Sequence, residues 1–235
     1  MVSERFEEID VQRVNVVDAD GTLRMVISGK AKLPDPVIGG RQLKGRQGPK
    51  VAGIIFYNDD GDECGGLVFG GSRDPAGTYW AGMHLSFDQF GDDQILVLDY
   101  QDENGRRSYG LSLYDRPGAF PVDDVLRLTS MPEGPEKDGL LRELRDSGAF
   151  GFHRMFLGRN SEGQPTIALN DSRGRQRLRL SVDSADSPRV EVLDESGRVV
   201  YTLPSADDLD RITELERQVL ELRQELEKLK DRARA

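Results

Sequence analysis

The chain has 235 residues, of which 31% are charged and 37% hydrophobic, and its formal net charge is −10. Phosphate backbones and anionic membranes attract clusters of Lys and Arg, so this charge argues against nucleic-acid and membrane partners. The sequence has no signal-peptide core and no stretch long enough to span a bilayer, which favours a cytoplasmic location. Its one cysteine, Cys64, excludes an intrachain disulfide.

Residues 1–203 are dominated by a repeated hairpin pattern. In each copy an alternating apolar run ends in Asp or Asn, a short turn with Gly follows, and a second run returns. Gly adopts positive φ without steric cost, and Asp or Asn bonds back to the turn backbone. The copies are residues 14–28, 54–69, 95–113, 167–183 and 190–203. The pattern predicts a mainly β body of antiparallel hairpins, forming a barrel or a sandwich with one packed and one solvated face.

Two segments interrupt this pattern. Residues 30–50 form a long, basic, Pro- and Gly-rich loop, whose cations would suit an anionic ligand or an acidic partner. The candidate anion-binding residues are Arg41, Lys44, Arg46 and Lys50. The plain alternative is a solvated mobile loop, and a loop of this length also suits a lid. Residues 120–148 predict a small helical insertion that caps a sheet edge or a barrel end, because they begin with Pro and acids and end at Gly.

The strand predicted within residues 78–90 carries the candidate ligand-binding residues. Trp80, His84, Ser86 and Asp88 alternate along it, so they share one face and could line a polar pocket. They do not form a catalytic triad within the strand, because four residues span ~13 Å; a triad needs an acid from a neighbouring strand. An ordinary solvated face explains the same pattern. We find no catalytic signature, and we predict no cofactor and no metal site, since the chain has only two histidines and one cysteine.

Residues 204–235 predict a coiled-coil helix that makes the protein an oligomer. Apolar residues recur at alternating steps of three and four, as in a heptad seam. The seam comprises Ile212, Leu215, Val219, Leu222, Leu226 and Leu229. A narrow stripe of this kind favours self-association over a helix docked on its own domain. The flanking charges favour parallel helices, and β-branched residues at the first seam positions are typical of dimers.

Two resemblances add to this interpretation. The run IDVQRVNVVDADGTLRMVISGKAKLP (9–34), with LVFGG (67–71) and HLSFDQF (84–90), resembles an uncharacterised family of bacterial β-rich proteins, to which no activity is attached. Arg211 to Glu216, RITELE, resembles the trimerisation motif of short parallel coiled coils, with Arg and Glu flanking the seam. The second resemblance favours a homotrimer over a dimer.

These features predict an oligomeric, non-catalytic β-rich binding or scaffold protein assembled by a parallel coiled coil. One alternative is a β-barrel small-molecule-binding protein or enzyme with its pocket near Trp80 and His84. Another is a structural component of a larger particle or fibre. We expect self-association in each case, together with a protein or small-molecule ligand. Three heptads are too few to hold an assembly alone, so contacts between the β bodies are expected as well.

Overall fold

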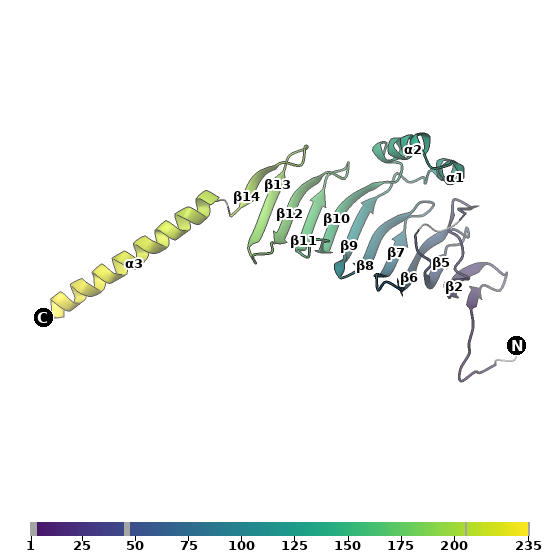
Figure 1. The fold of residues 1–235 in the computed structure, drawn as a ribbon, viewed down its shortest axis with the longest axis horizontal. Helices are drawn as coiled ribbons and strands as arrows, with labels where there is room; N and C mark the ends of the chain where they lie inside the picture. Colours follow the sequence, from purple (N-terminus) through teal and green to yellow (C-terminus); the bar gives the residue numbers. More distant parts are fainter. Residues whose placement is uncertain (1–3, 45–47, 205, 235) are drawn as a thin grey trace.

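The chain forms one long, open, antiparallel sheet. The computed structural model describes residues 4–44, 48–204 and 206–234. Twelve strands follow one another in chain order, and β1 and β14 form the two edges (Figure 1). The mainly β antiparallel prediction is therefore confirmed. The barrel and the sandwich are both wrong for the described part of the chain, because the sheet does not close and no second large sheet packs on it.

The large sheet contains β1 (Arg13–Val17), β2 (Leu23–Ser28), β5 (Ala52–Tyr57), β6 (Glu63–Arg73), β7 (Tyr79–Asp88), β8 (Gln94–Glu103), β9 (Arg106–Asp115), β10 (Phe152–Arg159), β11 (Pro165–Asn170), β12 (Gln176–Val182), β13 (Pro188–Leu193) and β14 (Val199–Leu203). A separate two-stranded hairpin contains β3 (Val37–Ile38) and β4 (Arg41–Gln42). The helices are α1 (Val122–Ser130), α2 (Pro135–Asp146) and α3 (Ala206–Arg234).

One turn design recurs along the sheet. Between β13 and β14, Oδ1 of Asp194 accepts hydrogen bonds from the backbone N–H groups of Ser196 at 2.9 Å and Arg198 at 3.0 Å. Gly197 takes a φ of 81° and donates its N–H to the Asp194 carbonyl. Equivalent side-chain bonds form at Asn58, Asn160, Asp171 and Asp183. The turn residues therefore set the hairpins, as the sequence pattern predicts.

The register of the strands aligns apolar residues in rows across the sheet. Each of the twelve strands contributes one aliphatic residue to a central row, and its members pair from strand to strand. The central row is Val14, Ile27, Ile54, Leu67, Leu85, Leu98, Leu111, Leu157, Ile167, Leu180, Val190 and Leu203. Side chains alternate between the faces of a strand, so the whole row lies on one face. We call this face the open face.

A second row runs beside the central row on the open face. It is apolar at every strand except β6, where Gly65 lies between Phe56 and Phe87. The row is Val16, Met25, Phe56, Gly65, Phe87, Leu96, Leu113, Met155, Leu169, Leu178, Val192 and Tyr201. Neither row contains a charged residue. The alternation in the sequence thus leads to an apolar face, but none of the described residues packs over this face.

The opposite face holds the core of the single chain, and we call it the covered face. Val26 and Ile55 are 0% and 1% exposed there and form a cluster with Tyr57. Leu33 and Val37, from the segment between β2 and β5, pack against this cluster. The predicted basic loop therefore contains the β3–β4 hairpin and covers the sheet near β2, β5 and β6. Toward β14 the covered face becomes polar, with Arg179 and Glu191 paired at 2.6 Å.

The predicted helical insertion is confirmed as the pair α1 and α2, between β9 and β10. Both helices lie at one end of the strands (Figure 1) and bury Leu128 and Leu144. Arg116, whose side chain is 7% exposed, holds the two ends of the insertion to the sheet. Its guanidinium donates to the carbonyls of Gln94 and Phe150.

The predicted C-terminal helix is present as α3, which extends away from the sheet beyond β14 (Figure 1). Among the described residues it makes no packing contact with the sheet comparable to those between neighbouring strands. Its exposed surface carries internal ion pairs, such as Arg217 with Glu214 and Glu221. The helix is therefore confirmed, and the coiled coil stays a prediction.

Candidate functional site

A cavity of about 700 Å³ lies on the covered face. Strands β5 to β8 form its floor, and the segment between β2 and β5 together with α1 forms its walls. Trp80, His84 and Ser86 line it, as the predicted polar face of this strand suggested. Val125 and Thr129 of α1 line the opposite side. The cavity is therefore a groove between the sheet and its covering segments, and it is not the lumen of a barrel.

The indole of Trp80 lies along the sheet because β6 carries a glycine beneath it. A Cβ atom added at Gly70 would lie 2.7 Å from Cη2 of Trp80. Gly82, on the same strand as Trp80, would place a Cβ 3.8 Å from Cζ3. The absence of a side chain at Gly70 thus makes room for the ring, and the ring closes one end of the cavity floor.

His84 pairs with Asp99, its cross-strand neighbour on β8. The His84 Nδ1 atom lies 3.3 Å from Oδ1 of Asp99, whose other oxygen accepts a hydrogen bond from Gln101 at 2.7 Å. Asp99 thereby orients the imidazole and favours a proton on Nδ1. The Nε2 atom of His84 is buried and has no hydrogen-bond partner among the described residues. This atom is available to a polar group of a ligand.

Ser86 and Asp88 interact with each other and do not complete a triad. The Ser86 hydroxyl bonds to the Asp88 carboxyl, and it makes no hydrogen bond to His84 Nε2. Burial is the main cause that raises the pKa of Asp88 to about 7, and the negative charges of Glu63 and Asp93 contribute to the same rise. A buried carboxyl that is partly protonated near neutral pH can both donate and accept hydrogen bonds. The arrangement suits recognition of a polar ligand better than nucleophilic attack.

The raised pKa of Asp88 makes stability depend on pH. Between about pH 4 and pH 7 the folded chain holds a proton that the unfolded chain has lost, so the free energy of unfolding falls as pH rises through this window. Asp88→Asn removes this dependence. We expect the variant to exceed the wild type by ~2–4 kcal/mol at pH 8, with the gain shrinking toward pH 5.

Urea unfolding between pH 5 and 8.5, at one protein concentration, measures this difference. Asp60→Asn changes an exposed turn carboxylate and should leave the pH dependence of the wild type intact. A stability difference for Asp88→Asn that is equal at both ends of the range would contradict the account.

The predicted anion-binding residues are spread over different surroundings. Arg41 forms an ion pair with Asp123 on α1, and Lys44 lines the cavity. Lys50 is exposed, and Arg46 lies outside the described residues. Binding of an anion by this loop stays a prediction, and the Arg41–Asp123 pair ties the loop to the helical insertion.

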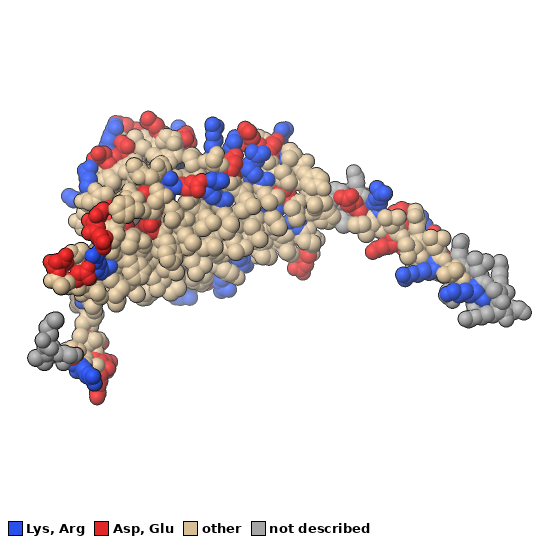
Figure 2. Space-filling model, turned by 180° about the vertical axis from the view of Figure 1, so that it is seen from behind, with Lys and Arg blue, Asp and Glu red and all other residues tan. Residues whose placement is uncertain are grey.

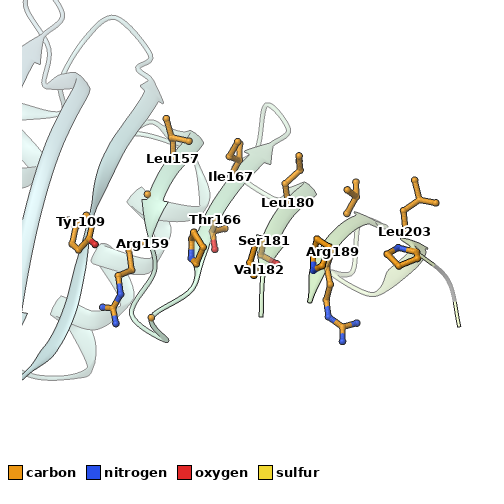
Figure 3. A pocket seen from close by; sticks show the side chains of 16 residues that line it. Tyr109, Leu157, Arg159, Thr166, Ile167, Leu180, Ser181, Val182, Arg189 and Leu203 are labelled. Carbon is orange, nitrogen blue, oxygen red and sulfur yellow. The ribbon is translucent and has the colours of Figure 1, made fainter. Parts of the chain in front are cut away.

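A second, shallower hollow of about 940 Å³ lies on the open face near the C-terminal end of the sheet. Leu157, Ile167, Leu180 and Leu203 project from β10, β11, β12 and β14 toward the same side and form an apolar wall (Figure 3). Tyr109 stands at the opposite end of this wall. The hollow is a part of the central row, and its lining is mostly hydrocarbon.

The predicted oligomerisation residues all lie in α3. The exposed fractions are 50% for both Ile212 and Leu215, 48% for Val219, 64% for Leu222 and 52% for Leu226. Arg211 and Glu216 are also exposed beside this seam. The side chain of Leu229 lies outside the described residues. From Ile212 to Leu226 the seam is therefore not covered by any of the described residues, as a helix that binds another copy requires.

Sequence reasoning missed the acids that act on this site. Asp99 comes from β8, Glu63 is the first residue of β6, and Asp93 lies in the turn between β7 and β8. Counting outward from the Gln89–Asp93 turn pairs His84 with Leu98, and only the bulge between Phe87 and Asp88 shifts the register so that Asp99 becomes the partner of His84. Among the described residues no group of three or more His, Cys, Asp or Glu side chains is placed to hold a metal ion.

No protein-family model matches the chain, and no curated protein matches it either. The resemblance of residues 9–34 to uncharacterised bacterial β-rich proteins stays a prediction. In the described part of the chain, none of the helices has the length and apolar character needed to cross a membrane.

Proposed function

We propose that this chain is an oligomeric, non-catalytic scaffold protein that displays copies of its β body from a C-terminal parallel coiled coil. The observation that carries the proposal is the exposed seam of α3, whose large apolar side chains are about half exposed in the single chain. Apolar residues repeated at heptad spacing on an isolated helix are stabilised by burial against the same residues of another helix. Several weak sites held in one orientation then bind a shared partner with avidity.

The flanking charges support a parallel trimer. In a parallel coil, Arg211 of one copy lies near Glu216 of the next, and exposed pairs of this kind contribute ~0.2–1 kcal/mol each. The same two residues supply the resemblance to short trimeric coiled coils. A dimer is the alternative, favoured by β-branched Ile212 and Val219 at the first seam positions.

Mass measurement of the full chain tests the proposal. We expect a particle about three times the chain mass of 26.2 kDa. Leu222→Glu places a carboxylate in the seam and should raise the dissociation constant at least about tenfold, since ~1.4 kcal/mol corresponds to that factor. Leu220→Glu is the matched control, because Leu220 is a 58% exposed leucine of the same helix that lies off the seam.

Sedimentation from low to high micromolar concentration separates these outcomes. A wild-type chain that is monomeric throughout would refute the proposal. Equal effects of Leu220→Glu and Leu222→Glu would refute the assigned seam, and twice the chain mass would favour the dimer.

A small-molecule-binding function is the second candidate. It is supported by the cavity of about 700 Å³ and by the buried Nε2 atom of His84 that faces no protein partner among the described residues. Pockets of this size with a few converging polar groups accommodate small ligands. Trp80 is the only tryptophan of the chain, so its fluorescence would report a ligand that enters the cavity.

A further inference from the structure

The open face is too large and too apolar for the surface of a monomer. Its central row crosses twelve strands, or about 53 Å at ~4.8 Å per strand, and with the second row it covers roughly 700 Å². The largest apolar patch on a typical monomer is only ~300–600 Å². Side chains on this face are strongly exposed, including Leu98 at 51%, Phe87 at 53% and Tyr201 at 53%.

The total accessible surface leads to the same conclusion. The chain exposes 16448 Å², whereas a compact monomer of 26.2 kDa exposes about 10,600 Å². Part of the excess belongs to α3 and to the exposed segment before β1, and part belongs to a sheet that is covered on one side only. Obligate homo-oligomers bury surface on this scale, roughly 1,000 Å² or more per subunit.

We propose that the open face is buried against further copies of this chain, with the central rows lying around the axis that the coiled coil continues. The inference rests on the proposed function and deepens it. The central row ends at Leu203, and the seam begins at Ile212. A parallel coil brings these junctions of all copies together, so the rows of neighbouring copies start side by side and run along the same axis.

The chemistry of the face favours a second copy over other occupants. Its central row contains only Leu, Ile and Val, so the row of one copy complements the row of another without needing charge partners. Charged side chains gather along the borders of the body, and a broad belt across the strands is free of them (Figure 2). The net charge of −10 opposes an anionic lipid surface as the covering partner.

The hollow at the C-terminal end of the row offers a receiving site. It is lined by Leu157, Ile167, Leu180 and Leu203 and lies closest to the coil (Figure 3). Large side chains of the open face on another copy, such as Tyr201, suit an apolar hollow of this kind. Contacts near the coil would form first, because the coil raises the local concentration of the bodies.

Two readouts on the full chain test the inference. Leu98→Lys puts a charge in the middle of the central row, and Gln101→Lys puts the same charge on the other face of the same strand. The first readout is mass at a series of concentrations. The second is the rate at which peroxide oxidises Met83, which is 48% exposed in the single chain and lies on the open face. Oxidation follows exposure, so we expect Met83 in the wild type to react about tenfold more slowly than in Leu98→Lys.

The outcomes separate this inference from the proposed function. Slow oxidation of Met83 in the wild type and in Gln101→Lys, with fast oxidation and weaker assembly in Leu98→Lys, supports the inference. If the oligomer depends on Leu222 but Met83 is oxidised equally fast in all variants, the coiled coil is supported and the buried open face is overturned. If Met83 stays protected in Leu222→Glu and the mass depends on Leu98 alone, the buried open face is supported and the coiled coil is overturned. If Met83 is protected in a particle that contains one chain with bound lipid, lipid covers the open face and a second copy does not.

Discussion

Replacing Ile55 with alanine should lower the free energy of unfolding by about 3–4 kcal/mol. Ile55 is 1% exposed and packs with Val26 and Tyr57 beneath Leu33 and Val37. The substitution removes three carbon atoms and leaves a cavity that the surrounding strands do not refill, because the sheet backbone holds them in place. Few residues of the single chain are this deeply buried, so the loss falls on a large fraction of its core.

Urea unfolding at a fixed protein concentration measures the change. Ile9→Ala is the matched control, because Ile9 is 62% exposed in the segment before β1, and it should change stability by less than ~0.5 kcal/mol. A cost for Ile55→Ala no greater than that of the control would mean that the segment between β2 and β5 does not cover the sheet in solution.

Gly158→Ala should destabilise the chain by ~3 kcal/mol or more, because the added methyl group has no room. Gly158 on β10 pairs with Gly110 on β9. A Cβ atom at Gly158 would lie 2.1 Å from the carbonyl oxygen of Tyr109 and 2.6 Å from Cα of Gly110. These contacts are with backbone, so the two strands must separate to relieve them.

The same substitution at Gly139 should act in the opposite direction. Gly139 lies within α2 with nothing within 4 Å of its added Cβ atom, and alanine there should raise stability by ~0.5–1 kcal/mol. Thermal unfolding of both variants beside the wild type tests the pair. Similar shifts at the two glycines would show that strands β9 and β10 do not approach each other as closely as described.

The hairpins were predictable because their information is local. Asp194 and Gly197 form a turn through bonds within five residues, and the alternation of Leu178, Leu180 and Val182 identifies a shared face. The local sequence does not determine whether another part of the chain covers that face. Alternation predicts a packed face in general, and here nothing in the described part of the chain packs on the apolar one. The barrel and sandwich predictions were wrong for this reason.

The candidate site was predictable only along one strand. Trp80, His84 and Ser86 share a face because side chains alternate, and all three line the cavity. Asp99 reaches His84 through hairpin register, which a bulge between Phe87 and Asp88 perturbs. α1 begins more than thirty residues after Ser86 in the sequence. Its position over the cavity depends on how the chain folds back after β9, which no periodicity in the sequence predicts.

The strictly sequential order of the strands has a consequence for how such a chain changes length in evolution. Every strand of the large sheet pairs only with its neighbours in that order, so each hairpin is a nearly independent module joined through two interfaces. Gain or loss of one hairpin would lengthen or shorten the body by about 9.6 Å and leave the other pairings unchanged. The central row would continue across the junction as long as the inserted module kept one aliphatic residue per strand. The number of strands after the helical insertion, from β10 to β14, would then set the distance between the point where the insertion leaves the sheet and the C-terminal helix.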